Sequence, residues 1–424
     1  MKPKIVITGL GAVCGAGKTA GEIFEAILAG QSAVKEISGW NAQSWPRQMA
    51  AEVTGVDNRT LVEDRKLHKM ISRTDLFGLY AANAAIAQSG LTTHRDSLGA
   101  AVAEFNDRSG IFVGSGGGNY GCNYDFFPAM SAAGGDLKKF GAQFAESVNP
   151  MWLLRNLPNN VLCHVGIRHH FKGANACITN HCTSGALAVA EAAAAIVAGE
   201  ADRAVAIGHD SPIEPETQLN FQQLELLAAA ALRPFDRDRD GTVLGEGAAA
   251  LVLEKEPDAK LRGATVLGEF LGSGCVTEAT GVLRIRPDGN GVARAIELAL
   301  ADAKISRADI GVIVAHGNAT RASDASETAG IHRVFGQKIP PVTGFKWACG
   351  HTIAASGILD LVLALTLLQR KIVPGIATLN WTDPDFSPLP VSAKPQSLCG
   401  ETALVICRGF GGMNVALIVR AAQP

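Results

Sequence analysis

The feature that most constrains the fold of this chain is the alternation of short β-branched runs with longer Ala- and Leu-rich stretches. Such runs predict buried strands and the longer stretches predict helices. The expected strands are residues 4–8, 110–113, 204–207, 249–253, 310–315, 402–406 and 415–419. The expected helices are residues 20–28, 76–88, 184–198, 291–303 and 356–369. This order predicts an α/β protein with a largely parallel core.

The chain also repeats itself coarsely. Ser184-Gly185 opens one apolar helix and Ser356-Gly357 opens another, each after a segment with a Cys or His. The strands expected after these helices, and the helix–strand pairs before them, also correspond: 249–253 with 402–406, and 76–88 plus 110–113 with 291–303 plus 310–315. The sequence therefore predicts two similar halves, residues 1–260 and 261–424.

Composition excludes several classes of protein. The 38 Lys and Arg nearly balance the 40 Asp and Glu, without a basic run, so nucleic acid is not an expected partner. The nine cysteines lack CxxC spacing, which argues against a disulfide framework or a structural zinc site and favours the reducing cytoplasm. The longest apolar stretch, residues 352–368, is short for a bilayer span and contains Asp360. We expect a buried helix there, and no membrane association.

Two glycine motifs near the N-terminus only superficially resemble nucleotide-binding loops. The run that begins Gly9-Leu10-Gly11 has Cys14 where a dinucleotide fingerprint needs Gly or Ala. The segment 17–19 resembles the end of a phosphate loop but has Ala12 where that motif needs glycine. We interpret both as part of a glycine-rich turn between a strand and a helix.

Cys182 is the first candidate for chemistry. It follows an apolar strand-like segment and directly precedes the helix that Ser184-Gly185 opens. The free N–H groups and positive dipole end at a helix N-terminus favour a thiolate. By position alone, a buried cysteine that acts as a small hydrophobic residue is the more common interpretation.

Two histidines support the catalytic interpretation. His316 ends an apolar strand, and His351 lies just before the second buried helix. Polar residues at the carboxyl ends of strands in α/β proteins tend to meet in one crevice. The glycine turn that contains Phe410, between two apolar strands, could present a backbone N–H to an oxyanion.

In chain order these motifs resemble the elongating β-ketoacyl-[acyl-carrier-protein] synthases, Cys-His-His condensing enzymes of the thiolase superfamily. The resemblance covers nearly the whole chain. It includes the segment 6–11, the nucleophile turn, the run Leu-Arg-Pro-Phe-Asp-Arg-Asp-Arg-Asp-Gly at 232–241 with Gly-Glu-Gly at 245–247, both histidine motifs and the terminal 409–412 turn. It implies a thiolase-like fold of two similar halves in a layered α-β-α-β-α arrangement.

The resemblance also implies an activity. Cys182 would take an acyl group from a carrier-protein thioester, and the N–H groups of Cys182 and Phe410 would form the oxyanion hole. Neutral His316 and His351 would hold malonyl-acyl carrier protein and stabilise its enolate as carbon dioxide leaves. The enolate would attack the Cys182 thioester in a decarboxylative Claisen condensation, giving a 3-oxoacyl-acyl carrier protein. No metal or organic cofactor is implied.

Further residues take roles by the same resemblance. Lys346 would organise the histidine pair electrostatically, and Phe410 would be a gate between the acyl pocket and the malonyl site. The residues expected to bind substrate, including the phosphopantetheine arm, are Asn318, Thr320, Asp360, Gly409 and Gly411.

The chain departs from the family pattern in three places. His181 stands where the family has Ala, and it is interpreted either as a structural hydrogen-bond donor or as part of an altered site. Asn318 replaces a threonine expected at the phosphopantetheine arm, and Asp360 stands where the family usually has Glu. The region 212–231 also looks compressed and more helical than usual. These departures leave open whether the chain acts in housekeeping fatty-acid elongation or in a specialised polyketide or polyene pathway.

The sequence is also compatible with two alternatives to a condensing synthase. One is a non-catalytic partner subunit of the chain-length-factor kind, which usually lacks the nucleophilic cysteine. The other is a thiolase-like transferase that uses coenzyme A, for which Cys407 would be the second cysteine. The expected partners are an acyl carrier protein, which Arg65, Lys66, Lys69 and Arg73 could contact, and a second synthase subunit in a homodimer or heterodimer.

Overall fold

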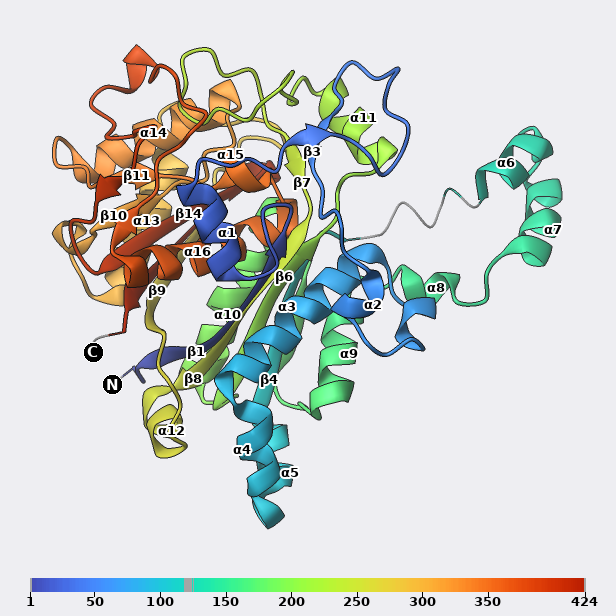
Figure 1. Ribbon diagram of the computed structural model, residues 1–424, viewed down its shortest axis with the longest axis horizontal. Coiled ribbons are helices and arrows are strands. Elements are labelled where there is room, and N and C mark those ends of the chain that lie inside the picture. The colour runs from blue at the N-terminus through green and yellow to red at the C-terminus, as the bar shows by residue number, and fades with distance from the viewer. Residues whose placement is uncertain (1, 118–123, 125, 423–424) are drawn as a thin grey trace.

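The computed structural model describes residues 2–117, 124 and 126–422. Its centre is a ten-stranded mixed sheet with the order β11-β10-β14-β15-β9-β1-β8-β6-β4-β5 (Figure 1). The strands are β1 (Ile5–Cys14), β4 (Ser109–Ser115), β5 (Asn175–Ile178), β6 (Arg203–Asp210), β8 (Gly247–Lys255), β9 (Gly268–Thr277), β10 (Val312–Val314), β11 (Val342–Thr343), β14 (Thr402–Gly409) and β15 (Met413–Ala421). The smaller strands are β2 (Lys35–Glu36), β3 (Met49–Ala51), β7 (Leu244–Gly245), β12 (Ile372–Val373) and β13 (Gln396–Ser397).

The large sheet consists of two halves with the same topology. Each half places the strands it contributes in the order third, second, fourth, fifth, first: β5-β4-β6-β8-β1 and β11-β10-β14-β15-β9. The pairing directions also match, because the first three strands of each row are parallel and the remaining pairs are antiparallel. A short pairing of β1 with β9 joins the halves. The predicted repeat is therefore confirmed as a fold, while the boundary after residue 260 stays a prediction.

Two details of the predicted repeat are wrong. The core is mixed rather than largely parallel, because β14 returns directly into β15 through the 410–412 turn without a helical crossover. The counterpart of β14 is β6, which follows the first buried helix directly, and not the strand expected at 249–253.

Helices cover both faces of the sheet, and two of them lie between its two halves. Helix α3 (Arg73–Ser89) packs on β1, β6 and β8, and helix α13 (Asn290–Ala303) packs on β9 and β15. Helix α14 (Arg321–Phe335) lies against α13, whereas α10 (Ser184–Ala198) and α16 (Ser356–Arg370) contact each other and strands of both halves. The other helices are α1 (Ala20–Leu28), α2 (Asn58–Leu61), α4 (Leu91–Ser97), α5 (Val102–Asp107), α6 (Phe127–Ala133), α7 (Leu137–Ser147), α8 (Trp152–Arg155), α9 (Asn160–His169), α11 (Pro215–Gln223), α12 (Glu256–Leu261) and α15 (Lys346–Cys349). The result is the layered thiolase-like α/β fold that the resemblance implied.

The central helices approach each other closely at the two Ser-Gly pairs. A Cβ on Gly185 would lie 2.6 Å from the carbonyl oxygen of Ala354, and one on Gly357 would lie 2.7 Å from the Cβ of Ala186. Windows that include α10 and α16 are long and apolar enough to span a membrane by length and composition, but 61% and 89% of their residues are buried inside the protein. They are helices of the protein core.

Gly17 lies in the turn between β1 and α1, as the sequence suggested, but Gly9 and Gly11 do not. Gly9 and Gly11 lie inside β1, which runs to Cys14. A Cβ on either glycine would lie about 2 Å from a backbone carbonyl oxygen of α3, of Ala85 for Gly9 (2.1 Å) and of Ala81 for Gly11 (2.0 Å). These glycines therefore serve close packing of a helix on a strand.

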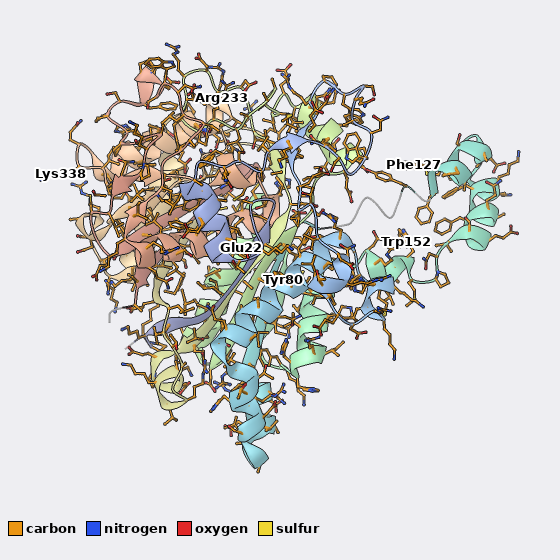
Figure 2. The ribbon with its side chains drawn as sticks, viewed as in Figure 1. Glu22, Tyr80, Phe127, Trp152, Arg233 and Lys338 are labelled. Atoms are coloured by element: carbon orange, nitrogen blue, oxygen red, sulfur yellow. The ribbon has the colours of Figure 1, made fainter. Side chains whose placement is uncertain are left out.

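Helices α6, α7 and α8 form an arm that extends away from the body of the molecule (Figure 1). Phe127 and Trp152 lie on it, clear of the main sheet (Figure 2). Aromatic contacts within the arm hold it together, among them Phe126 with Phe144 at 4.6 Å between ring centroids. Phe127, Met130 and Leu137 are exposed on it.

Candidate active site

The residues singled out from the sequence meet at one cavity of about 180 Å³. It lies where β10, β14 and the N-terminal turn of α10 converge. Of the predicted site residues, those that line it are Cys182, His316, Asn318, Thr320, His351, Gly409 and Phe410. The structure thus brings together residues that are up to 228 positions apart, from Cys182 to Phe410.

Cys182 lies in a short 3₁₀ turn, His181–Thr183, that runs directly into α10. The Ser184 hydroxyl fixes this turn, because it accepts from the N–H of Asn180 and donates to the carbonyl of His181. The Cys407 thiol donates to the carbonyl of Cys182. Burial raises the pKa of Cys182 well above its ordinary value, although nearby Lys346 lowers it. Burial thus favours the protonated thiol over the thiolate that a helix N-terminus would favour.

His316 is held by its backbone and by one ring nitrogen. Its N–H donates to Oε1 of Glu327 at 2.7 Å, and the N–H of Gly317 donates to Oε2 at 2.9 Å. The N–H of Arg408 donates to Nδ1 of His316 at 3.4 Å. Since Nδ1 accepts, the ring proton of the neutral imidazole lies on Nε2.

His351 has an equivalent arrangement. Its Nδ1 lies 2.9 Å from the Ser356 hydroxyl, which can donate to it, and Ser356 in turn lies 3.2 Å from the Thr352 hydroxyl. The rings of His351 and His316 are 5.2 Å apart at an angle of 83°. Burial, followed by the charge of Lys346, lowers the pKa of each ring well below its ordinary value. Both imidazoles are therefore neutral at pH 7 and able to donate through Nε2.

Lys346 and Asp360 lie behind the cavity and are not among the residues that line it. Their side chains are almost fully buried, and Nζ of Lys346 lies 2.6 Å from Oδ2 of Asp360. The pKa of Lys346 is raised: burial acts to lower it, and the charge and hydrogen bond of Asp360 outweigh that effect. This position fits the expected electrostatic role of Lys346. It gives no support to the expectation that Asp360 contacts substrate.

The loop after His316 places both expected arm-binding residues at the cavity. The side-chain oxygen of Asn318 accepts from the backbone N–H and the hydroxyl of Thr320, at 3.1 and 2.9 Å. Asn318 therefore orders the loop as well as lining the cavity. In the 410–412 turn, Gly411 has a φ of 79° and donates its N–H to Val282, and unlike Gly409 it does not line the cavity.

Phe410 separates this cavity from a larger one of about 860 Å³ that it also lines. Its ring centroid is 4.8 Å from that of His181 and 5.8 Å from that of Phe221. His181 lines the larger cavity, together with Asp210 and Ile353. Phe410 thus stands between two chambers, as a gate would.

Several residues at the site were not identified from the sequence. Glu327 and Ser356 hold the two histidines, and Arg408 and Glu278 form a buried ion pair beside the cavity. Leu224 and Leu226, next to α11, line it from the region that looked compressed in the sequence. Glu327 carries no local motif, so only its position one helical turn past Ser323 and Asp324 in a polar helix could have indicated it.

The basic residues expected to contact a carrier protein do not share one helix. Arg65 and Lys66 lie in a loop, Lys69 ends a 3₁₀ turn and Arg73 begins α3. Arg73 is engaged with Glu246, 2.5 Å away. The four residues therefore do not share one helix face, although Arg65, Lys66 and Lys69 are exposed.

Comparisons with known proteins agree with this geometry. Residues 2–259 match the β-ketoacyl synthase N-terminal domain and residues 267–380 match the β-ketoacyl synthase C-terminal domain. The chain is 30% identical to 3-oxoacyl-[acyl-carrier-protein] synthase 2 of Vibrio cholerae, over 99% of each chain. It is also 30% identical to the actinorhodin polyketide putative β-ketoacyl synthase 1 of Streptomyces coelicolor, over 100% of this chain and 90% of that one.

Solved structures give the same result. The ishigamide ketosynthase/chain length factor superposes with a TM-score of 0.90 at 26% identity, over the full length of both chains. A β-ketoacyl synthase from Burkholderia phymatum superposes with a TM-score of 0.86 at 28% identity, over 99% of this chain and all of that one. Fold and site together define a condensing enzyme of the acyltransferase class. The chain belongs to the β-ketoacyl synthase family, whose condensation serves fatty-acid or polyketide biosynthesis.

Proposed function

We propose that this ketosynthase joins an acyl group held on Cys182 to malonyl-acyl carrier protein through the residues that line the smaller cavity. The observation that carries the proposal is the convergence of Cys182, His316 and His351 on that cavity. In the first step Sγ attacks the carrier thioester, and the carrier leaves as a free thiol. The N–H groups of Cys182 and Phe410 stabilise the oxyanion. Gly409 supports this assignment, because a Cβ placed on it would lie 3.6 Å from Cβ of Cys182.

In the second step the two histidines act as hydrogen-bond donors. The Nε2–H groups of His316 and His351 bind the thioester oxygen of the malonyl group, where negative charge develops as carbon dioxide leaves. The resulting enolate carbon attacks the acyl carbon on Cys182. The C–S bond then breaks, the thiol recovers a proton, and the 3-oxoacyl product remains on the carrier.

The same site argues against the two alternatives. A non-catalytic partner subunit would have no use for a nucleophile and two hydrogen-bonded histidines in one cavity. A second catalytic cysteine at position 407 is disfavoured because burial raises the pKa of that thiol to about 12 and because it donates to the carbonyl of Cys182. We assign Cys407 a structural role.

Partners and pathway follow from the surface and the chambers. We assign the carrier protein to the mouth of the smaller cavity, near Asn318 and Thr320, and the acyl chain to the larger chamber beyond Phe410. The outer edge of β5, which pairs with no strand in the described part of the chain, and the exposed arm support pairing with a second synthase subunit. The side chains of Asn318 and His181, which differ from the family pattern, favour a specialised pathway over housekeeping elongation. The free cysteines of the described residues favour a reducing compartment such as the cytoplasm.

The intact mass of the protein after incubation with acyl carriers tests this function. Wild type should gain the mass of one acyl group, C182A should gain none, and addition of malonyl-acyl carrier protein should discharge the adduct as a 3-oxoacyl product. An adduct on another residue, or none on wild type with any carrier or acyl-coenzyme A, would contradict the proposal.

A further inference from the structure

His181 is held against the nucleophile in an unusual backbone conformation. Its φ is 48°, in the left-handed region that glycine and asparagine tolerate best. Its Nδ1 lies 3.0 Å from Sγ of Cys182. The ring is stacked with Phe221 at an interplanar angle of 15° and lies 4.8 Å from the ring of Phe410. The turn and the two aromatic rings thus orient one nitrogen at the reacting sulfur.

The protonation states on both sides of this contact are complementary. Burial lowers the pKa of His181 to about 4, so its imidazole is neutral, and burial keeps the Cys182 thiol protonated. A neutral imidazole with its proton on Nε2 accepts a hydrogen bond at Nδ1. In this tautomer the S–H group of Cys182 donates to His181 before any reaction begins.

The other histidines cannot accept this proton in the same way. The Nδ1 atoms of His316 and His351 are already engaged by the N–H of Arg408 and the hydroxyl of Ser356. Their Nε2 atoms carry protons and serve as donors. Among the residues that the structure describes, His181 is the histidine whose Nδ1 is directed at Sγ and is not engaged by another donor.

We propose that His181 is the catalytic base of the acyl-transfer step. Its Nδ1 takes the thiol proton as Sγ bonds to the acyl carbon, and it returns that proton to the carrier's pantetheine sulfur as the old C–S bond breaks. One S–H bond and one C–S bond are broken and one of each is formed, so no further reactant is needed. This inference rests on the proposed function, because it assigns a base to the first step of that reaction.

The pH dependence of acylation in the wild type provides the first test. The rate constant for acylation of Cys182 by an acyl-pantetheine thioester should be nearly flat from pH 5.5 to 8.5, because His181 is neutral and the thiol intact throughout. Attack by a free thiolate would instead rise about tenfold for each pH unit below the raised pKa of Cys182. Other titratable groups act on these residues: Lys346, Asp210 and Cys407 on Cys182, and His351 opposite His181. Asp210 titrates inside this pH range, because burial raises its pKa to about 6. The D210N variant removes that titration and should show the same flat profile.

Three substitutions separate a base from a structural residue. H181N fits the backbone conformation and can hydrogen-bond but cannot take a proton, H181F keeps the aromatic contacts, and H181G leaves a space for added imidazole. Each should lower the acylation rate at pH 7 by about 10²–10⁴-fold and restore the tenfold rise per pH unit. Imidazole should rescue H181G and not H181F.

Decarboxylation of a malonyl thioester is the control, since it depends on His316 and His351 and should remain within about threefold of wild type in all three variants. Acylation of H181N at the wild-type rate, a wild-type profile that rises tenfold per pH unit, or absent rescue of a decarboxylating H181G would overturn the assignment of His181. Failure of wild type to acylate at all would instead overturn the proposed function.

Discussion

At the residue scale, the surroundings of the two catalytic-site histidines make them neutral hydrogen-bond donors. A buried imidazole next to a lysine cannot hold a second proton, because burial and the Lys346 charge both lower its pKa. The backbone N–H of Arg408 fixes the proton of His316 on Nε2, and the Ser356 hydroxyl does the same for His351 when it donates to Nδ1. Neutral donors of this kind can hydrogen-bond to the enolate oxygen without a prior change in their protonation state.

Replacement of either histidine should separate the two half-reactions. In H316A or H351A the enolate loses one of its two donors, and malonyl decarboxylation should fall by about 10²–10³-fold. Acylation of Cys182 should continue, since its base and oxyanion donors remain. Gas chromatography of released carbon dioxide and the intact mass of the acyl-enzyme measure the two steps. Decarboxylation at the wild-type rate in both variants would refute the donor assignment.

The Lys346–Asp360 pair should affect stability and catalysis separately. Lys346→Met leaves the Asp360 carboxylate buried without its partner, at a cost of about 3–5 kcal/mol in the free energy of unfolding at neutral pH. A K346M/D360L double variant should regain most of that stability in urea unfolding. Its decarboxylation should still be at least about tenfold slow, because the positive charge behind the histidines is absent. Full recovery of activity in the double variant would show that Lys346 contributes only to folding.

At the element scale, the site depends on how closely α10 and α16 cross. Gly185 lies against the N-terminal turn of α16, and the Cys182 turn joins directly to α10. A change in the distance between these helices would move Sγ relative to His351. Packing of the two halves is thereby coupled to the geometry of the cavity.

A single added methyl group tests this coupling. In Gly185→Ala the new Cβ would approach the carbonyl oxygen of Ala354 at 2.6 Å, so the helices must separate, at a cost of about 1–3 kcal/mol. Acylation should slow as well. Gly141→Ala in α7 is the matched control, because its Cβ would meet nothing within 4 Å, and helix propensity predicts no loss and up to about 1 kcal/mol of gain. Equal urea midpoints for the two variants would contradict the packing argument.

Elements with a simple apolar pattern could be predicted from the sequence, and the others could not. The bounds of α1 and α10 were predicted correctly, because apolar residues dominate their buried positions, Ile and Phe in α1 and mainly Ala in α10. Strand β9 was missed because Gly268, Gly272 and Gly274 replace the β-branched residues that indicate a strand, leaving space for Leu365 of α16 and for α13. Helix α14 was missed because it buries polar residues, such as Asp324 and Glu327, that hold the loop after His316. The candidate site was therefore predictable where motifs carry the chemistry, but its supporting residues depend on tertiary contacts.

At the scale of the whole molecule, the sheet ends in an edge strand whose outer side has no partner among the described residues. Strand β5 is the last in the order, so its outer edge pairs with no strand among the described residues. Ile167 in α9, which is 69% exposed, lines a surface groove together with Asn175 of β5. The arm adds further exposed apolar side chains (Figure 2). An edge with these properties is an aggregation hazard unless another chain covers it.

We therefore expect the purified chain to form a dimer through β5, or to require a related subunit that covers the same edge. Light scattering after gel filtration at micromolar concentration should give about twice 44.1 kDa for the chain alone, or one copy of each subunit in a co-purified pair. Ile167→Asp places a charge beside β5 and should shift the assembly towards monomer. Leu261→Asp, at a side chain that is 90% exposed on α12, should leave the mass unchanged. A stable wild-type monomer that still acylates Cys182 would show that the edge needs no partner.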